Sequence, residues 1–302
     1  MRLKKTSEIL TNSCLSFSLS SITRTDFSLR IALGLLLIVS IGCKHSTEIK
    51  VQTMKMTLQN DSKTYKEELL HGEIADTRIE HISFAGPFSQ TFIQSKDSVG
   101  VFLFIKGHGI LKADTMSYTI IPETIAIPFS CGSMTLIVPE DDTLHLLQFT
   151  KKLSIQDLED LKNFPAQNKF DMYFMKFSDC APYTEKIKSP NTISRTVLPA
   201  DIIPRTSLGT VETKGPDAVG AHEHPMLDQL FLGLTDNDII VHANDQSTPF
   251  KAYSLLHIPI GSSHWATVDK DKKMYYMWMD FFLTKEGQEW LKTHKPISKK
   301  MN

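Results

Sequence analysis

The sequence predicts an all-β protein made of two successive β-barrels, with one short helix between them and another after the second. Short segments rich in Val, Ile, Phe and Thr, bounded by Gly, Pro, Asp or Ser, recur over residues 78–149 and 194–282. This pattern is typical of strands in sandwiches and barrels. A segment with helical spacing separates the two regions. The strand pattern of the first region also recurs in the second about 130 residues later.

The amino terminus has the features of an export signal. Residues 31–42 form an apolar run of twelve residues between Arg30 and Cys43. As a helix this run would rise about 18 Å, which is too short for a hydrocarbon core of roughly 30 Å. A basic flank, a short apolar stretch and a small final residue are typical of a secretory signal peptide, predicted here for residues 1–42. A core strand or an uncleaved anchor is the alternative.

The end of this run, Ser40-Ile41-Gly42-Cys43, resembles the bacterial lipobox, with Ser40 where that motif prefers Leu. The resemblance implies cleavage before Cys43 and acylation of its thiol. The mature chain is then expected in the bacterial cell envelope, anchored to a membrane by lipid at Cys43. Its soluble domains would lie in the periplasm or at the cell surface. The polar segment 43–73 would form a tether and a first strand.

Composition and charge narrow the possible partners. The 302 residues are 41% hydrophobic and 22% charged, as in globular proteins with a buried core. Beyond residue 43 the chain has 28 basic and 32 acidic side chains, a net charge of −4. This balance argues against nucleic acid, because nucleic-acid binders usually display a basic stripe. Outside the cytoplasm the two remaining cysteines, Cys131 and Cys180, are able to form a disulfide, and the sequence leaves their pairing open.

The first barrel is expected over residues 74–150 and the second over 190–283. A linker with one helix, residues 151–189, joins them, and residues 284–302 form a C-terminal helix and tail. Ser154 and Thr284 are suitable N-caps for the two helices. The linking helix is predicted from the helical spacing of its apolar residues, Ile155, Leu158 and Leu161. The candidate strands of the first barrel lie within residues 99–105, 117–128, 134–138 and 144–149.

Three histidines of the second region have the spacing of a metal site. His222 and His224 are two residues apart, so they would face the same side of a strand. His264 follows in a later strand. Imidazole nitrogens together with an oxygen ligand suit Mn, Fe, Ni, Cu or Zn. The sequence therefore predicts a site for one divalent transition metal.

Two motifs in this region resemble those of the cupin superfamily. The first cupin motif is HxH followed after three or four residues by a carboxylate, and here it begins at His222. The second is PxG followed by xxH, which here reads Pro259-Ile260-Gly261-Ser262-Ser263-His264. The resemblance implies two cupin-like barrels, each a double-stranded β-helix or jelly roll, and hence a bicupin. It also implies that His222, His224 and His264 bind the metal.

The oxygen ligand stays open between two neighbouring residues. Counting three residues after His224 gives Asp228, and counting four gives Gln229. The position of the following strand favours Gln229. Asp228 is favoured by chemistry, because a carboxylate neutralises the charge of a divalent ion and an amide does not.

The internal repeat predicts that the first barrel binds no metal. At offsets near 130 residues the histidine positions correspond to Ile93, Ser95 and Ser133, and the oxygen-ligand positions to Val99 and Gly100. These side chains are poor metal ligands. The first barrel is therefore expected to serve packing, homodimer formation or the lining of a pocket.

The resemblance to cupins implies a metal-dependent enzyme acting on a small polar molecule, such as a sugar or sugar acid. Isomerase, lyase, hydrolase and dioxygenase activities are not distinguished, because a fold does not determine its chemistry. The alternative is a lipoprotein that binds a small molecule, such as a carbohydrate, with the help of the metal but without turnover. His257, or a Tyr of the last strand, is the candidate for proton transfer, since strand alternation points Glu223 away from the histidines.

Overall fold

The computed structural model describes residues 48–292, apart from 59–61, 130 and 169–170 and the side chains of 167 and 290–292. The predicted leader, residues 1–42, and Cys43 lie outside the described residues. All described residues belong to one compact unit, His45–Asn302. No helix in this described part is long and apolar enough to cross a membrane.

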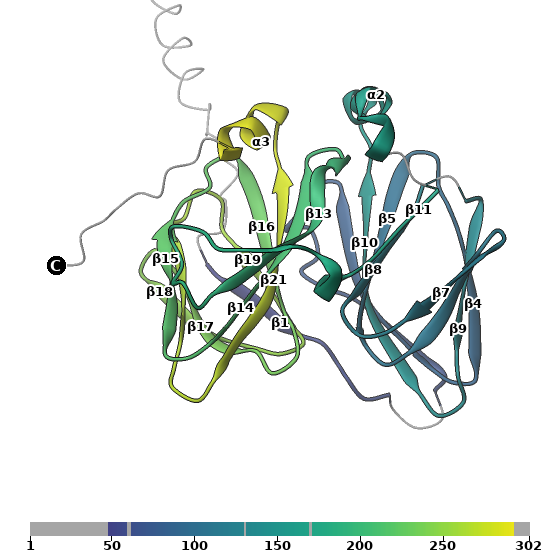
Figure 1. Ribbon diagram of the computed structural model, residues 1–302, viewed down its shortest axis with the longest axis horizontal. Coiled ribbons are helices and arrows are strands. Elements are labelled where there is room, and N and C mark those ends of the chain that lie inside the picture. Colours follow the sequence, from purple (N-terminus) through teal and green to yellow (C-terminus); the bar gives the residue numbers. More distant parts are fainter. Residues whose placement is uncertain (1–47, 59–61, 130, 169–170, 293–302) are drawn as a thin grey trace, which may run out of the picture. The chain divides into compact units, whose positions relative to one another are not determined.

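The first barrel consists of two antiparallel sheets that pack face to face around a common apolar core (Figure 1). The larger sheet has the order β11 (Met172–Lys176), β8 (Thr124–Pro128), β5 (Ser98–Lys106), β10 (Thr143–Lys152), β3 (Thr77–Ala85) and β2 (Thr64–Glu68). The smaller sheet has the order β4 (Phe88–Ile93), β9 (Ser133–Val138), β6 (Gly109–Ala113) and β7 (Met116–Ile120). Alternate residues of these strands point inward, because successive side chains of a strand face opposite sides.

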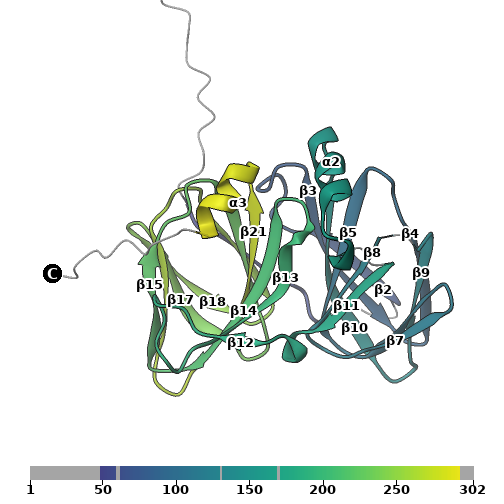
Figure 2. The same cartoon turned by 45° about the horizontal axis from the view of Figure 1, so that its top comes forward.

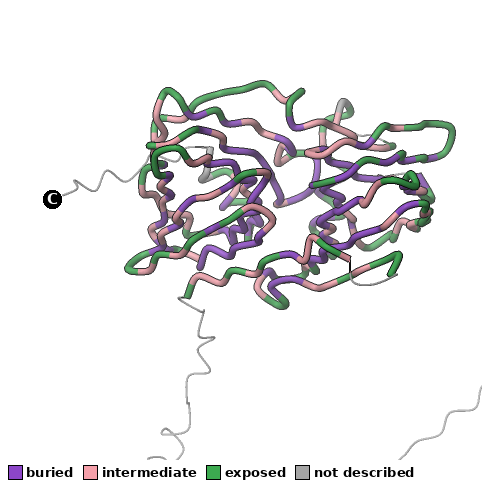
Figure 3. Tube along the Cα trace, turned by 90° about the horizontal axis from the view of Figure 1, so that it is seen from below, coloured by how far each residue is buried: buried purple, intermediate pink, exposed green. Residues whose placement is uncertain are grey.

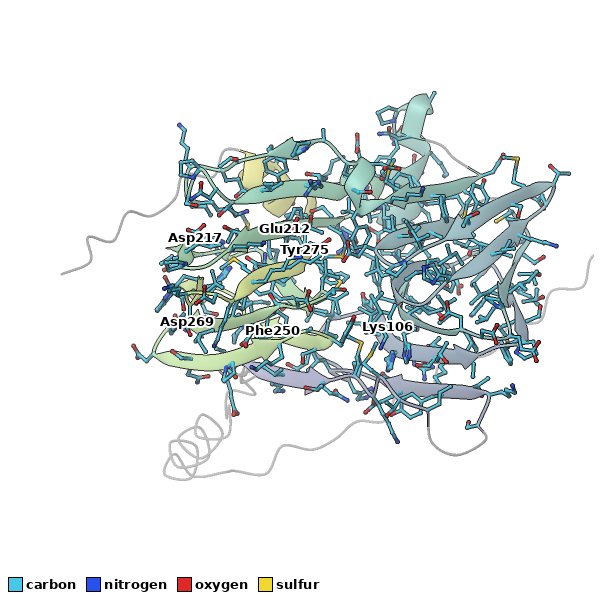
Figure 4. The ribbon with its side chains drawn as sticks, turned by 60° about the horizontal axis from the view of Figure 1, so that its bottom comes forward. Lys106, Glu212, Asp217, Phe250, Asp269 and Tyr275 are labelled. Carbon is cyan, nitrogen blue, oxygen red and sulfur yellow. The ribbon has the colours of Figure 1, made fainter. Side chains whose placement is uncertain are left out.

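The second barrel has the same architecture. Its larger sheet has the order β1 (Lys50–Thr53), β19 (Ser254–Ile258), β16 (Leu227–Gly233), β21 (Lys273–Phe282), β14 (Thr206–Lys214), β13 (Ile193–Ile203) and β12 (Pro182–Tyr183). Its smaller sheet has the order β15 (Asp217–His222), β20 (His264–Val268), β17 (Asp238–Ala243) and β18 (Gln246–Lys251). The interior is filled by apolar side chains of both sheets, among them the fully buried Phe250 (Figure 4).

Two short helices complete the described fold. Helix α2 (Ile155–Asn163) begins with a capping box in which Asp157 N donates to Ser154 Oγ at 3.1 Å and Ser154 N donates to Asp157 Oδ2 at 2.9 Å. Helix α3 (Lys285–Lys292) begins after Thr284, whose Oγ1 accepts a bond from Gly287 N at 3.3 Å. The predicted all-β class with a linking helix and a C-terminal helix is confirmed.

The two barrels share a third core that lies between their larger sheets. Phe149 of β10 and Phe281 of β21 meet there edge to face, with ring centroids 5.6 Å apart. Leu103 and Leu230 belong to the same core and are fully buried. Buried positions run through both barrels and continue into this region (Figure 3).

Each barrel also receives a strand from outside its predicted range. β1 precedes the first barrel in sequence but pairs with β19 of the second, with Lys50 opposite His257. β11 lies within the predicted linker and pairs with β8 of the first barrel, with Met172 opposite Pro128. The segment expected to hold a tether and one strand therefore holds β1 and β2, which belong to different barrels. Edge strands of this kind satisfy backbone groups that would otherwise be exposed on the sheet.

Candidate metal centre

The end of the second barrel brings the three histidines together. His222 is the last residue of β15 and pairs in register with His264, the first residue of β20. His224 follows in the loop that leads to β16. One nitrogen of each ring lies within 4.8 Å of the nitrogens of the other two. The side chains predicted from sequence spacing thus converge in space.

Hydrogen bonds to the backbone orient two of the rings. His222 Nδ1 donates to the carbonyl oxygen of Gly220 at 2.8 Å, and His264 Nδ1 donates to that of Ser262 at 3.1 Å. A carbonyl oxygen only accepts, so both neutral rings carry their hydrogen on Nδ1 and have a lone pair on Nε2. Metal-binding histidines are commonly oriented by bonds of this kind.

Gln229 lies on the inner face of β16 and lines the same cavity as the histidines. Its Nε2 donates to Asp280 Oδ1 at 2.7 Å, which fixes the orientation of the amide. Its Oε1 is buried and has no hydrogen-bond partner among the described residues. A buried acceptor without a partner is costly, and a cation beside it would remove that cost. The donor set of three imidazoles and one oxygen therefore fits a divalent transition metal.

The structure corrects two expectations, because Asp228 and His257 lie on the outer side of the barrel. Adjacent residues of a strand face opposite sides, so Asp228 points away from Gln229. Its Oδ1 lies 3.4 Å from His257 Nε2, and His257 Nδ1 lies 3.1 Å from the Glu73 carboxylate. Asp228 and His257 are absent from the lining of the cavity. Asp228 is therefore not placed to bind the metal, and His257 is not placed to move protons there.

The cavity of the second barrel has a volume of about 500 Å³. Besides the histidines and Gln229, its wall includes three aromatic side chains and one carboxyl of β16 and β21: Phe231, Tyr276, Trp278 and Asp280. A strap, residues 183–188, forms another wall. The strap is attached to β15, because Gly220 N donates to the Ile187 carbonyl oxygen at 2.7 Å. Such a mostly apolar cavity with few polar groups is typical of a small-molecule site.

Two buried ionisable groups in this cavity were not predicted from the sequence. The pKa of Asp280 is raised to about 7, mainly by burial and also by the nearby Glu185, while Gln229 and Lys188 oppose the shift. Burial lowers the pKa of Lys188, against the charge of Glu185, to which its Nζ donates at 2.6 Å. One feature of the sequence does indicate Asp280, because it is a single acid within the apolar segment 274–282. Lys188 lies in an irregular polar segment, and no feature of the sequence indicates it.

The corresponding end of the first barrel has a smaller cavity of about 180 Å³. There β4 and β9 pair Ile93 with Ser133, just as β15 and β20 pair His222 with His264. Ile93 lines this cavity although it is 84% exposed, and Ser95, Gly100 and Ser133 line it as well. Cys131 also lines it, and Cys131 and Cys180 are both free thiols.

Comparisons with known proteins place the fold. No family model matches the sequence, and no curated protein matches it. Solved structures do match. The putative glyoxylate-induced protein of Pseudomonas aeruginosa has a TM-score of 0.61 at 10% identity, over 72% of this chain and 80% of that protein. Oxalate decarboxylase of Lactobacillus farciminis has a TM-score of 0.54 at 12% identity, over 81% and 90%.

A third structural neighbour is named as a cupin. The cupin 2 conserved barrel domain protein of Leptotrichia buccalis has a TM-score of 0.52 at 12% identity, over 76% of this chain and 97% of that protein. The chain therefore has the cupin fold in its two-barrel form, and the predicted bicupin architecture is confirmed. At these identities the likeness concerns the fold alone.

Proposed function

We propose that this chain is an envelope-anchored bicupin lipoprotein that binds one divalent transition metal in its second barrel and acts on a small polar molecule. The observation that carries the proposal is the meeting of His222, His224 and His264 beside the buried oxygen of Gln229. A sugar or sugar acid fits a cavity of about 500 Å³ with a polar end and aromatic walls. One structural neighbour is an oxalate decarboxylase, which is consistent with a small polar substrate.

A bound divalent metal supplies Lewis acidity toward an oxygen of the substrate. The protein supplies the geometry. Backbone carbonyls of Gly220 and Ser262 orient two imidazoles, and the bond from Gln229 to Asp280 orients the amide oxygen. The strap, residues 183–188, and the aromatic wall enclose part of the cavity.

Asp280 is the residue best placed to move a proton. It lines the cavity beside Gln229, and its pKa of about 7 lets the carboxyl exist in both protonation states near neutral pH. General acid–base groups work best when their pKa lies close to the working pH. Tyr276 lines the same cavity, but burial raises the pKa of its hydroxyl far above neutral, so it keeps its proton and acts as a hydrogen-bond donor.

Metal analysis of the purified full chain tests the site. We expect about one divalent ion per wild-type chain and a loss of that ion in the His222→Ala/His224→Ala variant. The matched control is Ser95→Ala/Ser133→Ala, which changes positions at the corresponding end of the first barrel and should keep the ion. Equal metal content in the wild type and the histidine variant would refute the site.

A non-catalytic binding protein is the second candidate, and it is favoured by the neutral amide of Gln229 in place of a carboxylate. Protein loaded with Mn, Fe, Ni, Cu or Zn would be incubated with sugars, uronic acids and small keto acids, and both binding and product would be followed. Catalysis predicts that Asp280→Asn retains binding but loses turnover by about 100-fold or more. Metal-dependent binding with no product under any metal supports the binding protein.

A further inference from the structure

Helix α2 exposes the apolar side chains of Ile155 and Leu158 and buries the acids Asp157 and Asp160. Ile155 is 89% exposed and Leu158 is 37% exposed, and residues three apart share a helix face. Asp157, in contrast, is fully buried and accepts bonds from Arg205 Nε at 2.8 Å and Nη2 at 2.6 Å. A surface helix ordinarily buries its apolar stripe. The ion pair with Arg205 therefore turns the apolar face of α2 toward the outside.

The same end of the two barrels exposes two further large apolar side chains. Arg205 connects α2 to the start of α3, because its Nη1 donates to the carbonyl oxygen of Leu283 at 3.2 Å, and Leu283 is 44% exposed. In the first barrel a short loop leads from Ile93 to Ser98, which pairs with Lys152 just before α2. Helices α2 and α3 lie at the same end in both views (Figures 1 and 2). We call this surface the apolar end, defined by Ile93, Ile155, Leu158 and Leu283.

The sheet register shows that β1 begins toward the apolar end. β1 runs antiparallel to β19, β19 to β16, and β16 to β21, so β1 runs opposite to β21. Since β21 runs toward Leu283, β1 begins at the end of the sheet where Leu283 lies. Only seven positions separate Cys43 from Lys50. An extended segment of that length spans at most about 24 Å.

We propose that the apolar end is a membrane-docking surface, and that its partner is the bilayer in which Cys43 is anchored. This inference rests on the lipid anchor of the proposed function. The short tether holds the apolar end near the headgroups, where exposed Ile and Leu side chains enter the boundary between headgroups and acyl chains. The last ten residues of the chain contain three Lys and no acid, which favours anionic headgroups.

The test compares hydrogen exchange of α2 in the full, acylated chain on phosphatidylcholine–phosphatidylglycerol vesicles with that of Cys43→Ser in vesicle-free solution. We expect the amides of residues 155–163 to exchange several-fold more slowly on vesicles. In the Ile155→Ser/Leu158→Ser variant this slowing should disappear, while sedimentation with vesicles persists through the lipid. The matched control is Ile110→Ser/Ile193→Ser. These residues are 42% and 38% exposed, near the ends of their barrels that face away from the apolar end.

The outcomes separate the docking surface from the anchor. An acylated chain that sediments with vesicles, but whose α2 exchanges as fast as in solution, overturns docking and leaves the anchor intact. If Cys43 carries no lipid, the anchor fails, and docking then requires that added phosphatidylglycerol vesicles slow α2 in the unmodified chain. No slowing there overturns docking too. Slowing that depends on protein concentration and not on vesicles would assign this face to a second copy of the chain and overturn the membrane proposal.

Discussion

The corresponding strand ends of the two barrels agree in register and differ in their side chains. His222 opposite His264 in the second barrel corresponds to Ile93 opposite Ser133 in the first. In the larger sheets, Gln229 opposite Asp280 corresponds to Gly100 opposite Thr150. Both barrels fold around apolar cores of similar construction, so the fold does not require the ligand set. Burying an amide and a carboxyl is costly, and only the second barrel does so at this position, which indicates function.

The two larger sheets also differ in the side chains on their outer faces. In the first barrel Ser83 pairs with His145, and His81 lies beside them. His145 Nδ1 is 2.7 Å from Ser83 Oγ and 3.3 Å from His81 Nε2. In the second barrel the corresponding pair is Glu212 and Tyr275 (Figure 4). The buried histidines of the first barrel thus lie outside it, whereas the second barrel has His264 inside and His257 outside.

The largest expected effect that follows from this difference is acid sensitivity of the first barrel. Burial lowers the pKa of His81 and His145 to about 4 from 6.5, so the unfolded chain binds their protons first as the pH falls. The stability from the neutral rings is complete above about pH 6.5 and is lost on acidification toward pH 4, by roughly 3 kcal/mol for each histidine. Tyr65 packs on His81, and Lys106 and Asp142 act on the charge of His145.

Chemical denaturation of the wild type and of His81→Gln/His145→Gln between pH 4 and pH 8 measures this loss. The variant should have the flatter stability profile. The matched control is Thr210→Val in the second barrel, a buried, non-titratable position whose Oγ1 has no hydrogen-bond partner among the described residues, and it should keep the wild-type slope. An unchanged slope in the histidine variant would mean that other groups cause the acid sensitivity.

The next effect tests whether the two barrels unfold as one body. Phe149→Ala removes a fully buried ring from the core between the barrels, and such a truncation costs about 3–5 kcal/mol. The three tryptophans of the sequence, Trp265, Trp278 and Trp290, all follow the first barrel. Their fluorescence transition should therefore shift to lower denaturant together with the circular dichroism transition.

The control for this experiment is Leu136→Ala, which empties a site in the core that belongs to the first barrel alone. Separate midpoints for fluorescence and circular dichroism in Phe149→Ala would contradict a shared core. A coincident shift in both variants would extend the cooperativity to the interior of the first barrel as well.

The smallest effect concerns Gln229 and Asp280, the pair that distinguishes the cavity of the second barrel from that of the first. Asp280→Ala removes the acceptor that orients the Gln229 amide, and loss of such a supporting bond typically weakens metal binding about 10- to 100-fold. Thr150→Ala changes the corresponding position of the first barrel and should leave the affinity unchanged. Competition with a chelator measures both dissociation constants. Equal affinity in wild type and Asp280→Ala would show that Gln229 does not depend on this bond.

Features that depend on neighbouring residues were predictable from the sequence. The strands near residues 99–105, 134–138 and 144–149, and the cap at Ser154, follow from short-range pattern and backbone hydrogen bonding. The convergence of the three histidines was predictable because a motif with fixed spacing sets which strand ends carry them. The choice between Asp228 and Gln229 was not predictable in this way, since a shift of one residue in a strand reverses the face.

The sequence by itself determined the two-barrel class, both helix caps and the three histidines, because these depend on periodicity and spacing over a few residues. Only the tertiary structure decided which barrel receives β1 and β11. It also decided that Gln229 and not Asp228 faces the cavity, and that Gln229 donates a hydrogen bond to Asp280. The pairings of β1 and β11 and the bond from Gln229 to Asp280 join residues that lie 44 to 207 positions apart. Pairing over such distances is selected by the packing of the whole chain and leaves no local pattern.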